Sequence, residues 1–418
     1  MIEYFSYLQN AQIEFSGETM LTLAEIKKAA ALITGKIIKT PLVHSPTFSN
    51  MFGGDVYLKL ENFQKTGSFK VRGAANKILS SLESIGPQGV VAASAGNHAQ
   101  GVALAASQAG IPATIIMPEW ASITKQEATI GYGGDVRLSG SSVEESIAKA
   151  MQLADSGRMF IHPFDDLSIM AGQGTVALEI LSDLSDADTI VAPVGGGGLI
   201  SGLALAAKSI NPDITIVGVQ AEVCASAPAA IKSGCPMPVT AAASLADGIT
   251  VKKMGDLPFE IVNQYVDDIV LVTEQQIAAA MLMFLERKKT LAEGAGAAPL
   301  AALINGSISV SDRQKIVLLV SGGNVDSPLL GRIINQGLLK HGRIVRLRVT
   351  LSDRPGSLSG MLNTVAKVNA NVLHIYHDRN VRDNPIDVTR VELEIETRGH
   401  EHAAEVKSAL EEAGYHLE

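Results

Sequence analysis

The segment from residue 89 to residue 220 constrains the fold more than any other part of the chain. Short apolar runs alternate there with stretches of helical periodicity, and the expected strands cover residues 89–94, 112–117, 135–138, 159–164, 189–194 and 215–219. Helices fill the gaps, for example over residues 98–109 and over residues 142–154, where Ser142 is the expected cap. This alternation predicts an α/β fold with open, mostly parallel sheets covered on both faces. Ligands bind such sheets beyond the carboxyl ends of the strands, so motifs at those ends are the most informative.

Length and charge narrow the class of protein. A chain of 418 residues favours two or three folding units over a single core. The 34 Lys and Arg residues against 43 Asp and Glu residues give a net charge of −9, and no basic stripe interrupts it. Because a net negative surface repels nucleic acid and anionic lipid, we expect neither as a partner.

Cysteine usage and the uncharged segments indicate a cytoplasmic protein. The only two cysteines, Cys224 and Cys235, form no CxxC pair, and no histidine lies at zinc-ligand spacing from them, so we expect a reducing compartment and no metal site. An uncharged run in the middle of the chain, residues 189–207, contains four consecutive glycines and a proline, which argues against a membrane helix. Residues 1–19 carry three acidic and no basic residues, unlike a secretory signal, and we expect residues 1–20 to be an N-terminal extension.

The pattern changes near residue 340. Residues 343–350 alternate charged and apolar side chains, as a half-exposed strand does. A turn over residues 353–356 precedes a helix over 357–369, strands over 372–376 and 388–395, a helix over 401–413 and a short tail. This βαββα order, with a possible last strand, predicts a separate C-terminal domain of roughly 75 residues.

The first chemical motif is Lys-Thr-Gly-Ser-Phe-Lys, residues 65–70. We expect Ser68 to cap a helix that begins at Phe69, which places Lys70 in the first turn. A lysine there opposes the helix dipole, and the same field favours the neutral amine that attacks an aldehyde. Taken alone, Lys70 would be interpreted as a solvated surface lysine.

The second motif is Ser-Ala-Gly-Asn-His, residues 94–98, between a strand and a helix. Main-chain N–H groups at a helix start form a cradle for a carboxylate or phosphate, and the Asn97 amide can bond a ring oxygen. The structural alternative is a tight turn with Asn97 as a cap and His98 as a satisfied polar residue.

The third motif is a run of four glycines, Gly195 to Gly198, followed by Leu199 at the end of a strand. Glycines let the backbone wrap an anion, and the helix N-terminus favours its charge. A dinucleotide site is the rival, because Glu222 follows at the spacing of a ribose ligand. However, Ser201 stands where the third glycine of that pattern belongs, and no Gly-Lys-Ser/Thr step exists. A single phosphate fits best.

The fourth motif is Ser-Gly-Gly-Asn, residues 321–324, after an apolar strand at residues 315–320. The hydroxyl of Ser321 at the carboxyl end of a strand can meet a ring nitrogen as a neutral partner. A capping serine in a glycine turn explains the motif equally well when it is taken alone.

In this order and at these separations, the four motifs resemble those of the threonine dehydratase (threonine ammonia-lyase) family, which depends on pyridoxal 5′-phosphate (PLP). This family has the two-subdomain, tryptophan-synthase-β-like fold known as PLP fold type II. The resemblance covers residues 21–339, with a smaller subdomain at about 61–165, and includes residues 247–249 and 293–297. Residues 342–418 resemble an ACT domain, an α+β regulatory module of βαββαβ order that commonly binds amino acids.

The resemblance implies a role for each motif. Lys70 would hold the cofactor as an imine beside Phe69, Asn97 would bond its 3′ oxygen, and Ser321 would face its pyridine nitrogen. Its phosphate would lie on Gly195, Gly196, Gly197, Gly198 and Leu199. The substrate carboxylate would lie on Ser94, Ala95, Gly96, Asn97 and His98. The cofactor expected is therefore PLP.

The implied reaction removes water and ammonia from threonine to give 2-oxobutanoate, or from serine to give pyruvate. The freed Lys70 amine would take the α-proton. A serine partner, unlike an aspartate, does not hold the pyridine nitrogen protonated, which favours elimination over transamination.

Two positions depart from related enzymes. Related serine racemases carry a second serine in the segment equivalent to residues 94–98, where this chain has Ala95, so we expect weak racemisation. Gln220 stands where some relatives have a cation-binding glutamate, which again leaves no metal site expected.

Regulation and assembly follow from the ACT-like region. Its expected effector loops are residues 353–358 and 369–372, with Asp353, Pro355, Gly356 and Asn371 as candidate ligands for an amino acid. An exposed βαβ edge favours pairing with another subunit, so we expect a homo-oligomer, and pairing without any effector is the alternative.

Three other functions stay open at this point: a serine racemase or another PLP-dependent β-replacement enzyme, a non-catalytic amino-acid sensor, and a nicotinamide-dependent oxidoreductase. The intact Lys70 argues against the sensor, and the broken glycine spacing argues against the oxidoreductase.

Overall fold

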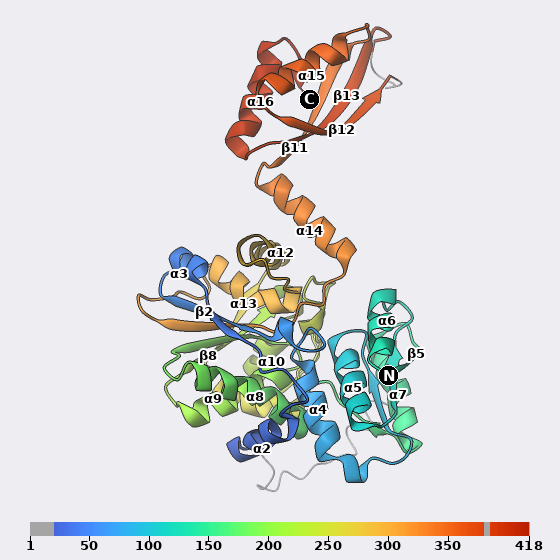
Figure 1. Ribbon diagram of the computed structural model, residues 1–418, viewed down its shortest axis with the longest axis vertical. Helices are drawn as coiled ribbons and strands as arrows, with labels where there is room; N and C mark the ends of the chain where they lie inside the picture. Colours follow the sequence, from blue (N-terminus) through green and yellow to red (C-terminus); the bar gives the residue numbers. More distant parts are fainter. Residues whose placement is uncertain (1–20, 380–384, 418) are drawn as a thin grey trace. The chain divides into compact units, whose positions relative to one another are not determined.

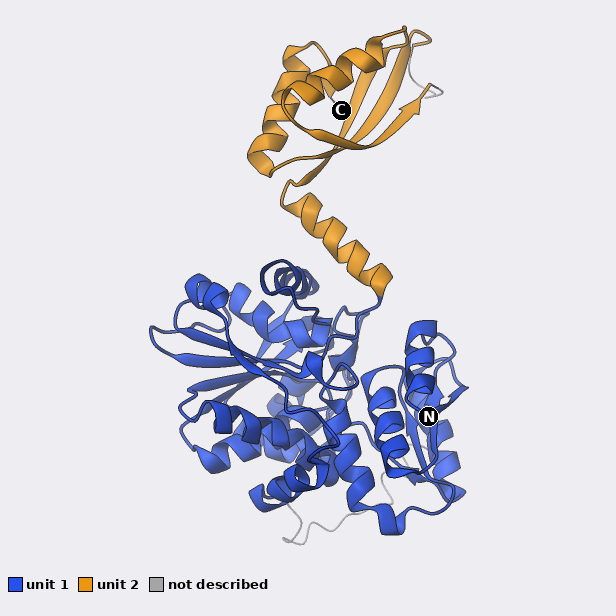
Figure 2. Ribbon diagram, viewed as in Figure 1, with its two compact units in different colours: residues 1–326 blue, residues 327–418 orange. Residues whose placement is uncertain are grey.

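The computed structural model describes residues 21–379 and 385–417, and the expected extension over residues 1–20 lies outside them. The chain divides into two compact units, residues 1–326 and 327–418 (Figure 2). The division falls before helix α14 (Ser327–Lys340), whereas the sequence placed the boundary after it. None of the described helices is long and apolar enough to cross a membrane.

A six-stranded sheet forms the larger part of the first unit (Figure 1). Its strands, in spatial order, are β1 (Leu42–His44), β2 (Asp55–Leu60), β10 (Lys315–Val320), β7 (Thr189–Pro193), β8 (Thr215–Ala221) and β9 (Asp268–Val272). Only β1 pairs antiparallel, with β2. β10 and β7 are buried along almost their whole length, as strands covered on both faces should be.

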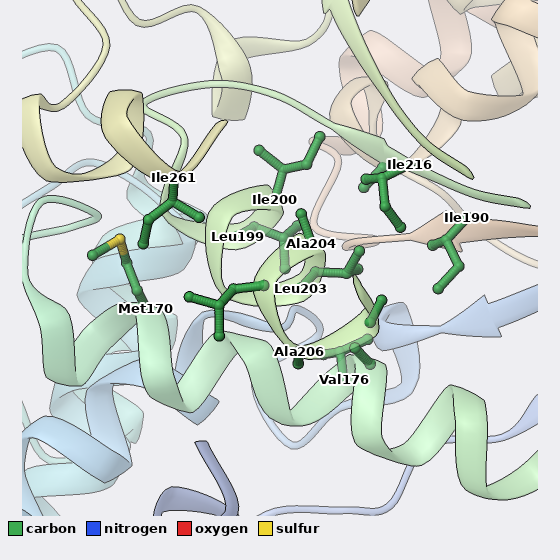
Figure 3. Close-up of a cluster of buried hydrophobic side chains, with 14 of the residues drawn as sticks. Met170, Val176, Ile190, Leu199, Ile200, Leu203, Ala204, Ala206, Ile216 and Ile261 are labelled. Carbon is green, nitrogen blue, oxygen red and sulfur yellow. The ribbon is translucent and has the colours of Figure 1, made fainter. Parts of the chain in front are cut away.

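Helices cover this sheet. They are α2 (Leu23–Ile33), α3 (Pro46–Phe52), α8 (Leu167–Asp183), α9 (Gly198–Ile210), α10 (Ser226–Ser233), α11 (Asp256–Tyr265), α12 (Glu274–Met283), the π-helix η5 (Phe284–Lys288) and α13 (Gly294–Ile304). Short 3-10 turns lie at η1 (Glu61–Phe63), η3 (Glu222–Cys224) and η4 (Asp247–Ile249). Figure 3 shows the core between α8, α9 and the sheet, where Val176, Leu203 and Ile190 pack together.

A four-stranded parallel sheet forms the smaller part of the first unit. Its spatial order is β5 (Asp135–Leu138), β4 (Ala113–Met117), β3 (Val90–Ala93) and β6 (Met159–Phe160). The helices α4 (Lys70–Ser80), α5 (Asn97–Ala109), α6 (Ile123–Gly131) and α7 (Val143–Asp155), with the 3-10 turn η2 (Leu82–Ser84), accompany it. The predicted α/β class with mostly parallel sheets is therefore confirmed.

Local signals explain where several helices begin. Thr22 and Glu25 form a reciprocal capping box at α2, and the Ser142 hydroxyl accepts from the main-chain N–H of Glu145 at α7, as predicted. One strand is shorter than predicted: β6 ends at Phe160, not at residue 164. Beyond that point the chain leaves the sheet, and residues 163 and 164 enter the candidate site described below.

The second unit carries α14 and an antiparallel sheet of order β12 (Asn371–Asp378), β13 (Val388–Glu396), β11 (Ile344–Ser352) and β14 (His416–Leu417). Helices α15 (Ser357–Lys367) and α16 (His400–Glu412) pack on its apolar face through Met361, Val365 and Val406. The predicted βαββα order is confirmed, and the tail adds the last strand β14.

Candidate active site

The first, second and fourth sequence motifs meet in the first unit. The main-chain N–H of Phe69 donates to the Ser321 carbonyl at 3.1 Å, and Ser68 pairs with Gly322 in an isolated β-bridge. The Asn324 amide donates to Asn97 Oδ1 at 2.8 Å. Segments separated by more than two hundred residues in sequence are therefore hydrogen-bonded to one another.

Lys70 is the first residue of α4, and its side chain is partly buried. Its amine donates to the Pro163 carbonyl at 2.9 Å and lies 5.3 Å from the centre of the Phe69 ring. Burial lowers the pKa of this amine to about 8, although the nearby Glu293 carboxylate acts in the opposite direction. The low pKa expected for Lys70 therefore has burial as its main cause, and not the helix dipole.

The predicted cap of this helix is wrong. The capping position is Phe69, whose backbone is already helical, and α4 begins one residue later than expected. The Ser68 hydroxyl makes no capping bond, because Ser68 is held by its bridge to Gly322. This hydroxyl is buried and has no hydrogen-bond partner among the described residues, which leaves it free for a ligand.

The glycine run lies between β7 and the start of α9. Gly197 has a φ of +95°, and a Cβ there would lie 2.7 Å from Pro258 Cβ. A Cβ on Gly198 would lie 2.7 Å from the carbonyl oxygen of Phe164, and one on Gly196 would overlap the Phe164 ring. The loop therefore requires glycine, and it presents main-chain N–H groups at the N-terminus of a 13-residue helix.

Residues 163 and 164 link this loop to Lys70, although the sequence pattern predicts a strand there. Pro163 accepts from the Lys70 amine, and Phe164 packs on the glycine run. The sequence around them gave one usable signal: Pro163, which cannot donate to a strand ladder.

The loop of residues 94–98 follows β3 and leads into α5. Gly96 is the capping residue, and its N–H donates to the Ser94 hydroxyl at 3.1 Å. The Asn97 side chain is not a cap but points to Glu293. Burial lowers the pKa of His98 to about 3, and its Nε2 is 2.9 Å from the Ile161 carbonyl oxygen, so His98 is neutral.

Glu293 belongs to the stretch 293–297 that resembles the family, but the sequence motifs predict no role for its side chain. The residue caps α13 and is 5% exposed. Its carboxylate oxygens accept from the Asn97 amide at 2.8 and 3.1 Å. Burial, together with the neighbouring Asp247, raises its pKa to about 7. The available signal was that Glu293 is the only charged residue between Thr290 and Asn305.

Two charged pairs connect parts of the first unit that are far apart in sequence. Lys125 of α6 lies 2.9 Å from Asp247 of η4, and Lys252 lies 2.9 Å from Glu144 of α7. Both pairs cross from the smaller sheet's helices to the segment over residues 247–252.

The candidate effector residues do not all come together in the second unit. Asp353, Pro355 and Gly356 lie in the turn between β11 and α15, where Asp353 accepts from Arg379 at 3.1 Å. Asn371 pairs with Glu396, the last residue of the nine-residue strand β13, whereas the turn lies beside the first residue of that strand. The two ends of β13 are about 25 Å apart.

Within residues 21–379 and 385–417, no group of three or more His, Cys, Asp or Glu side chains could hold a metal ion. At Gln220, both polar atoms are engaged: Oε1 accepts from Ala227 N at 2.9 Å, and Nε2 donates to the Ser226 hydroxyl at 3.1 Å.

Comparison with known proteins identifies the class. Residues 33–322 match the family model described as pyridoxal-phosphate-dependent enzyme. The chain belongs to this family, and PLP is its cofactor. The resemblance of the motifs to threonine dehydratases is also confirmed by the relatives.

Two relatives match over nearly the whole chain. The L-threonine ammonia-lyase of Thermotoga maritima is 47% identical over 95% of this chain and 99% of its own length. The L-threonine ammonia-lyase of Geobacter sulfurreducens is 43% identical over 95% of this chain and 98% of its own length. The catabolic L-threonine dehydratase of Escherichia coli K12 is 43% identical over 75% of this chain and 96% of its own length.

Solved structures agree on the fold. The threonine deaminase of T.th. has a TM-score of 0.69 at 36% identity, covering 73% of this chain and 99% of its own. Maize serine racemase has a TM-score of 0.72 at 36% identity, covering 77% and 99%. The predicted PLP fold type II catalytic unit is therefore confirmed.

The residues present fit PLP. A lysine amine with a lowered pKa can form an imine with an aldehyde, and a glycine cradle at a helix N-terminus suits a phosphate. The Ser68 hydroxyl, next to these motifs, is buried and has no hydrogen-bond partner among the described residues.

Proposed function

We propose that the chain deaminates L-threonine to 2-oxobutanoate and ammonia, and L-serine to pyruvate and ammonia. One observation carries this proposal. The Lys70 amine, whose pKa is lowered to about 8, donates to the Pro163 carbonyl, and the next residue, Phe164, packs on the glycine run. The relatives named L-threonine ammonia-lyase, at 43–47% identity, support threonine as the substrate.

Each motif then has a role toward the cofactor. Lys70 holds its aldehyde, Asn97 donates to its 3′ oxygen, and Ser321 meets its pyridine nitrogen. Gly195, Gly196, Gly197, Gly198 and Leu199 hold its phosphate. The contacts that join Phe69, Ser321, Asn324 and Asn97 support this arrangement.

Bound PLP supplies an electron sink conjugated to the α-carbon of the substrate. The main-chain N–H groups of residues 94–98 bind the substrate carboxylate, which orients the α-hydrogen. The neutral Lys70 amine takes the α-proton, and the resulting ammonium returns a proton to the β-hydroxyl, which leaves as water. A second water then hydrolyses the released enamine, so one threonine gives one 2-oxobutanoate and one ammonia.

Ser321 favours elimination because a hydroxyl is a neutral partner for the ring nitrogen. It is 1% exposed, so water does not compete for that position. Burial lowers the pKa values of His98 and His162 to about 3 and about 4, which makes both imidazoles much weaker bases than the Lys70 amine. Lys70 is therefore the strongest base among these three residues.

Oxo-acid release from threonine and serine tests the proposal directly. The wild-type protein should release 2-oxobutanoate from threonine and show a cofactor absorbance band, and Lys70→Ala should lose both. Release of D-serine from L-serine as fast as 2-oxobutanoate from threonine would instead favour a racemase. A protein that binds PLP without turnover would be a sensor.

The second unit is proposed to be an ACT-like regulatory domain. Its strand order and βαββαβ sequence support this, as does the comparison with shorter relatives, which match only 75–76% of the chain. If an amino acid binds at the turn of Asp353 to Gly356, removing residues after His341 should abolish the response of activity to that amino acid. An unchanged response would overturn the regulatory role.

Assembly and location complete the proposal. We expect a homo-oligomer, supported by the edge strand β12, whose side chains are mostly exposed. Cytoplasmic location is supported by Cys224 and Cys235, which are both free thiols.

A further inference from the structure

The orientation of the Asn97 amide is set by a chain of hydrogen bonds that begins at a main-chain carbonyl. Thr66 O accepts from Asn324 Nδ2 at 2.7 Å, and a carbonyl oxygen can only accept. The same Asn324 nitrogen donates to Asn97 Oδ1 at 2.8 Å. Asn97 Oδ1 is therefore an acceptor, and Asn97 Nδ2 must be the atom that faces Glu293.

Glu293 accepts from Asn97 with both oxygens, at 2.8 and 3.1 Å. The two oxygens of one carboxylate lie too close together to take both hydrogens of an amide nitrogen, which diverge by ~120°. One N–H of Asn97 is thus shared by the carboxylate, and the second N–H points elsewhere.

The backbone and the carboxylate of Glu293 both interact with the segment over residues 322–324. The main-chain N–H of Glu293 donates to the Gly322 carbonyl at 3.0 Å, and the Asn324 main-chain N–H interacts with the carboxylate. A Cβ on Gly322 would lie 2.3 Å from Glu293 Oε1, so a side chain there would displace the carboxylate. The surrounding charged groups are Asp247 on η4, Lys125 on α6 and Lys70 on α4.

We infer that Glu293 is a positioning residue that directs the second N–H of Asn97 toward the cofactor's 3′ oxygen. This inference rests on the proposed function, because it takes Asn97 as the ligand of that oxygen. It adds a residue outside the four sequence motifs. Without the carboxylate, the Asn97 amide keeps only the bond to Asn324 and can rotate away.

Equilibrium binding of PLP to the apoenzyme tests the inference. Glu293→Ala should weaken PLP binding by about tenfold to a hundredfold, the range for loss of a hydrogen bond to a charged group. Glu293→Gln keeps an acceptor oxygen of the same reach and should restore most of the affinity. Glu127→Gln is the matched control, because it removes one negative charge from an exposed position on α6. This variant should bind PLP with wild-type affinity.

Two further readouts separate positioning from a general structural effect. In an Asn97→Ala background, Glu293→Ala should cause less than about a twofold further loss, because the pair acts as one unit. Between pH 6 and 8, the absorbance band of the bound cofactor should change with pH in the wild type and stay constant in Glu293→Gln.

The outcomes are distinguishable from failure of the proposed function. If the wild-type protein neither binds PLP nor releases oxo acid, the proposed function fails. If it does both while Glu293→Ala and Glu293→Gln bind PLP with wild-type affinity, only the inference about Glu293 is overturned. A full additional loss in the Asn97→Ala background would also overturn it.

Discussion

Arg72 and Glu61 form a two-bond ion pair in which neither side chain is exposed. Arg72 Nε donates to Oε2 at 2.8 Å and Nη2 donates to Oε1 at 2.7 Å. Glu179 of α8 accepts a second pair of bonds from Arg72, and Lys59 of β2 lies 2.5 Å from Glu179. This network joins β2, α4 and α8. Arg72 follows Lys70 by two residues in α4, so the network anchors the helix that carries Lys70.

Removing one partner of this network should be strongly destabilising. Arg72→Ala leaves Glu61 buried without its cation, and we expect a loss of about 3–5 kcal/mol. Arg346→Ala, which breaks the exposed pair with Glu394 in the second unit, should cost about 1 kcal/mol or less. Urea unfolding followed by circular dichroism measures both. Equal midpoints for the two variants would contradict the energetic importance of burial.

The rate at which the apoenzyme captures PLP should rise with pH around the pKa of Lys70. With a pKa of about 8, the neutral fraction of the amine grows about tenfold between pH 7 and pH 9. Glu293→Gln should lower the midpoint, because the Glu293 charge raises the pKa of Lys70. A model lysine peptide, with its pKa of about 10.4, should show no plateau by pH 9. A protein profile that matches the peptide would show that Lys70 is not the amine.

His98 should make the first unit sensitive to acid. Its pKa is near 3 in the folded chain and 6.5 ordinarily, so the unfolded chain binds more protons between these values. Stability is therefore lost as pH falls below about 6.5. His98→Gln keeps a donor for the Ile161 carbonyl without titrating. It should lose less stability between pH 7 and pH 4, measured by chemical unfolding. Identical slopes for variant and wild type would refute this.

Gly197→Ala should weaken PLP binding and lower stability. The alanine would have to adopt a φ of +95° and approach Pro258, at a cost of about 1–3 kcal/mol. Gly131→Ala is the matched control, since a Cβ there meets open space in α6. We expect the control to bind PLP normally, with both measured by titration and thermal melting. If both variants bind alike, the glycine run is not the phosphate loop.

Ala95→Ser should increase racemisation of serine. A hydroxyl on the loop after β3 supplies the acid that a methyl group cannot, and we expect about a tenfold or larger rise in D-serine formation. Threonine deamination should persist, because Lys70 is unchanged. Chiral chromatography of the products checks the outcome. A variant that deaminates threonine but forms no more D-serine would show that Ala95 does not limit racemisation.

The sequence predicted the sheets well because buried parallel strands need continuous apolar runs. The strand at residues 135–138 agrees with β5, and the strand at 315–320 agrees with β10. Strand β6 was overestimated because residues 161–164 are as apolar as a strand, yet they turn away to meet Lys70 and the glycine run. Hydrophobic pattern does not distinguish burial in a sheet from burial beside a site.

The sequence proposes site residues only where one short segment carries the relevant side chains. Lys70, Asn97, Ser321 and the glycine run each belong to such a local motif. Glu293 does not, because a single glutamate has no local signature, and its importance comes from Asn97 and Gly322 lying beside it. Asn371 shows the reverse case, since the sequence places it in a loop. It begins β12 and pairs with Glu396, at the end of β13 that is remote from Asp353.

By itself, the sequence determined the α/β class, the four motifs proposed to bind the cofactor and the order of the C-terminal elements, because these follow from periodicity and from residues adjacent in the chain. Only the tertiary structure decided which amide faces Glu293, why the Lys70 amine is less basic, and that Ser68 leaves its hydroxyl unpaired. Those properties depend on desolvation and on contacts between segments separated by hundreds of residues, which no local pattern encodes.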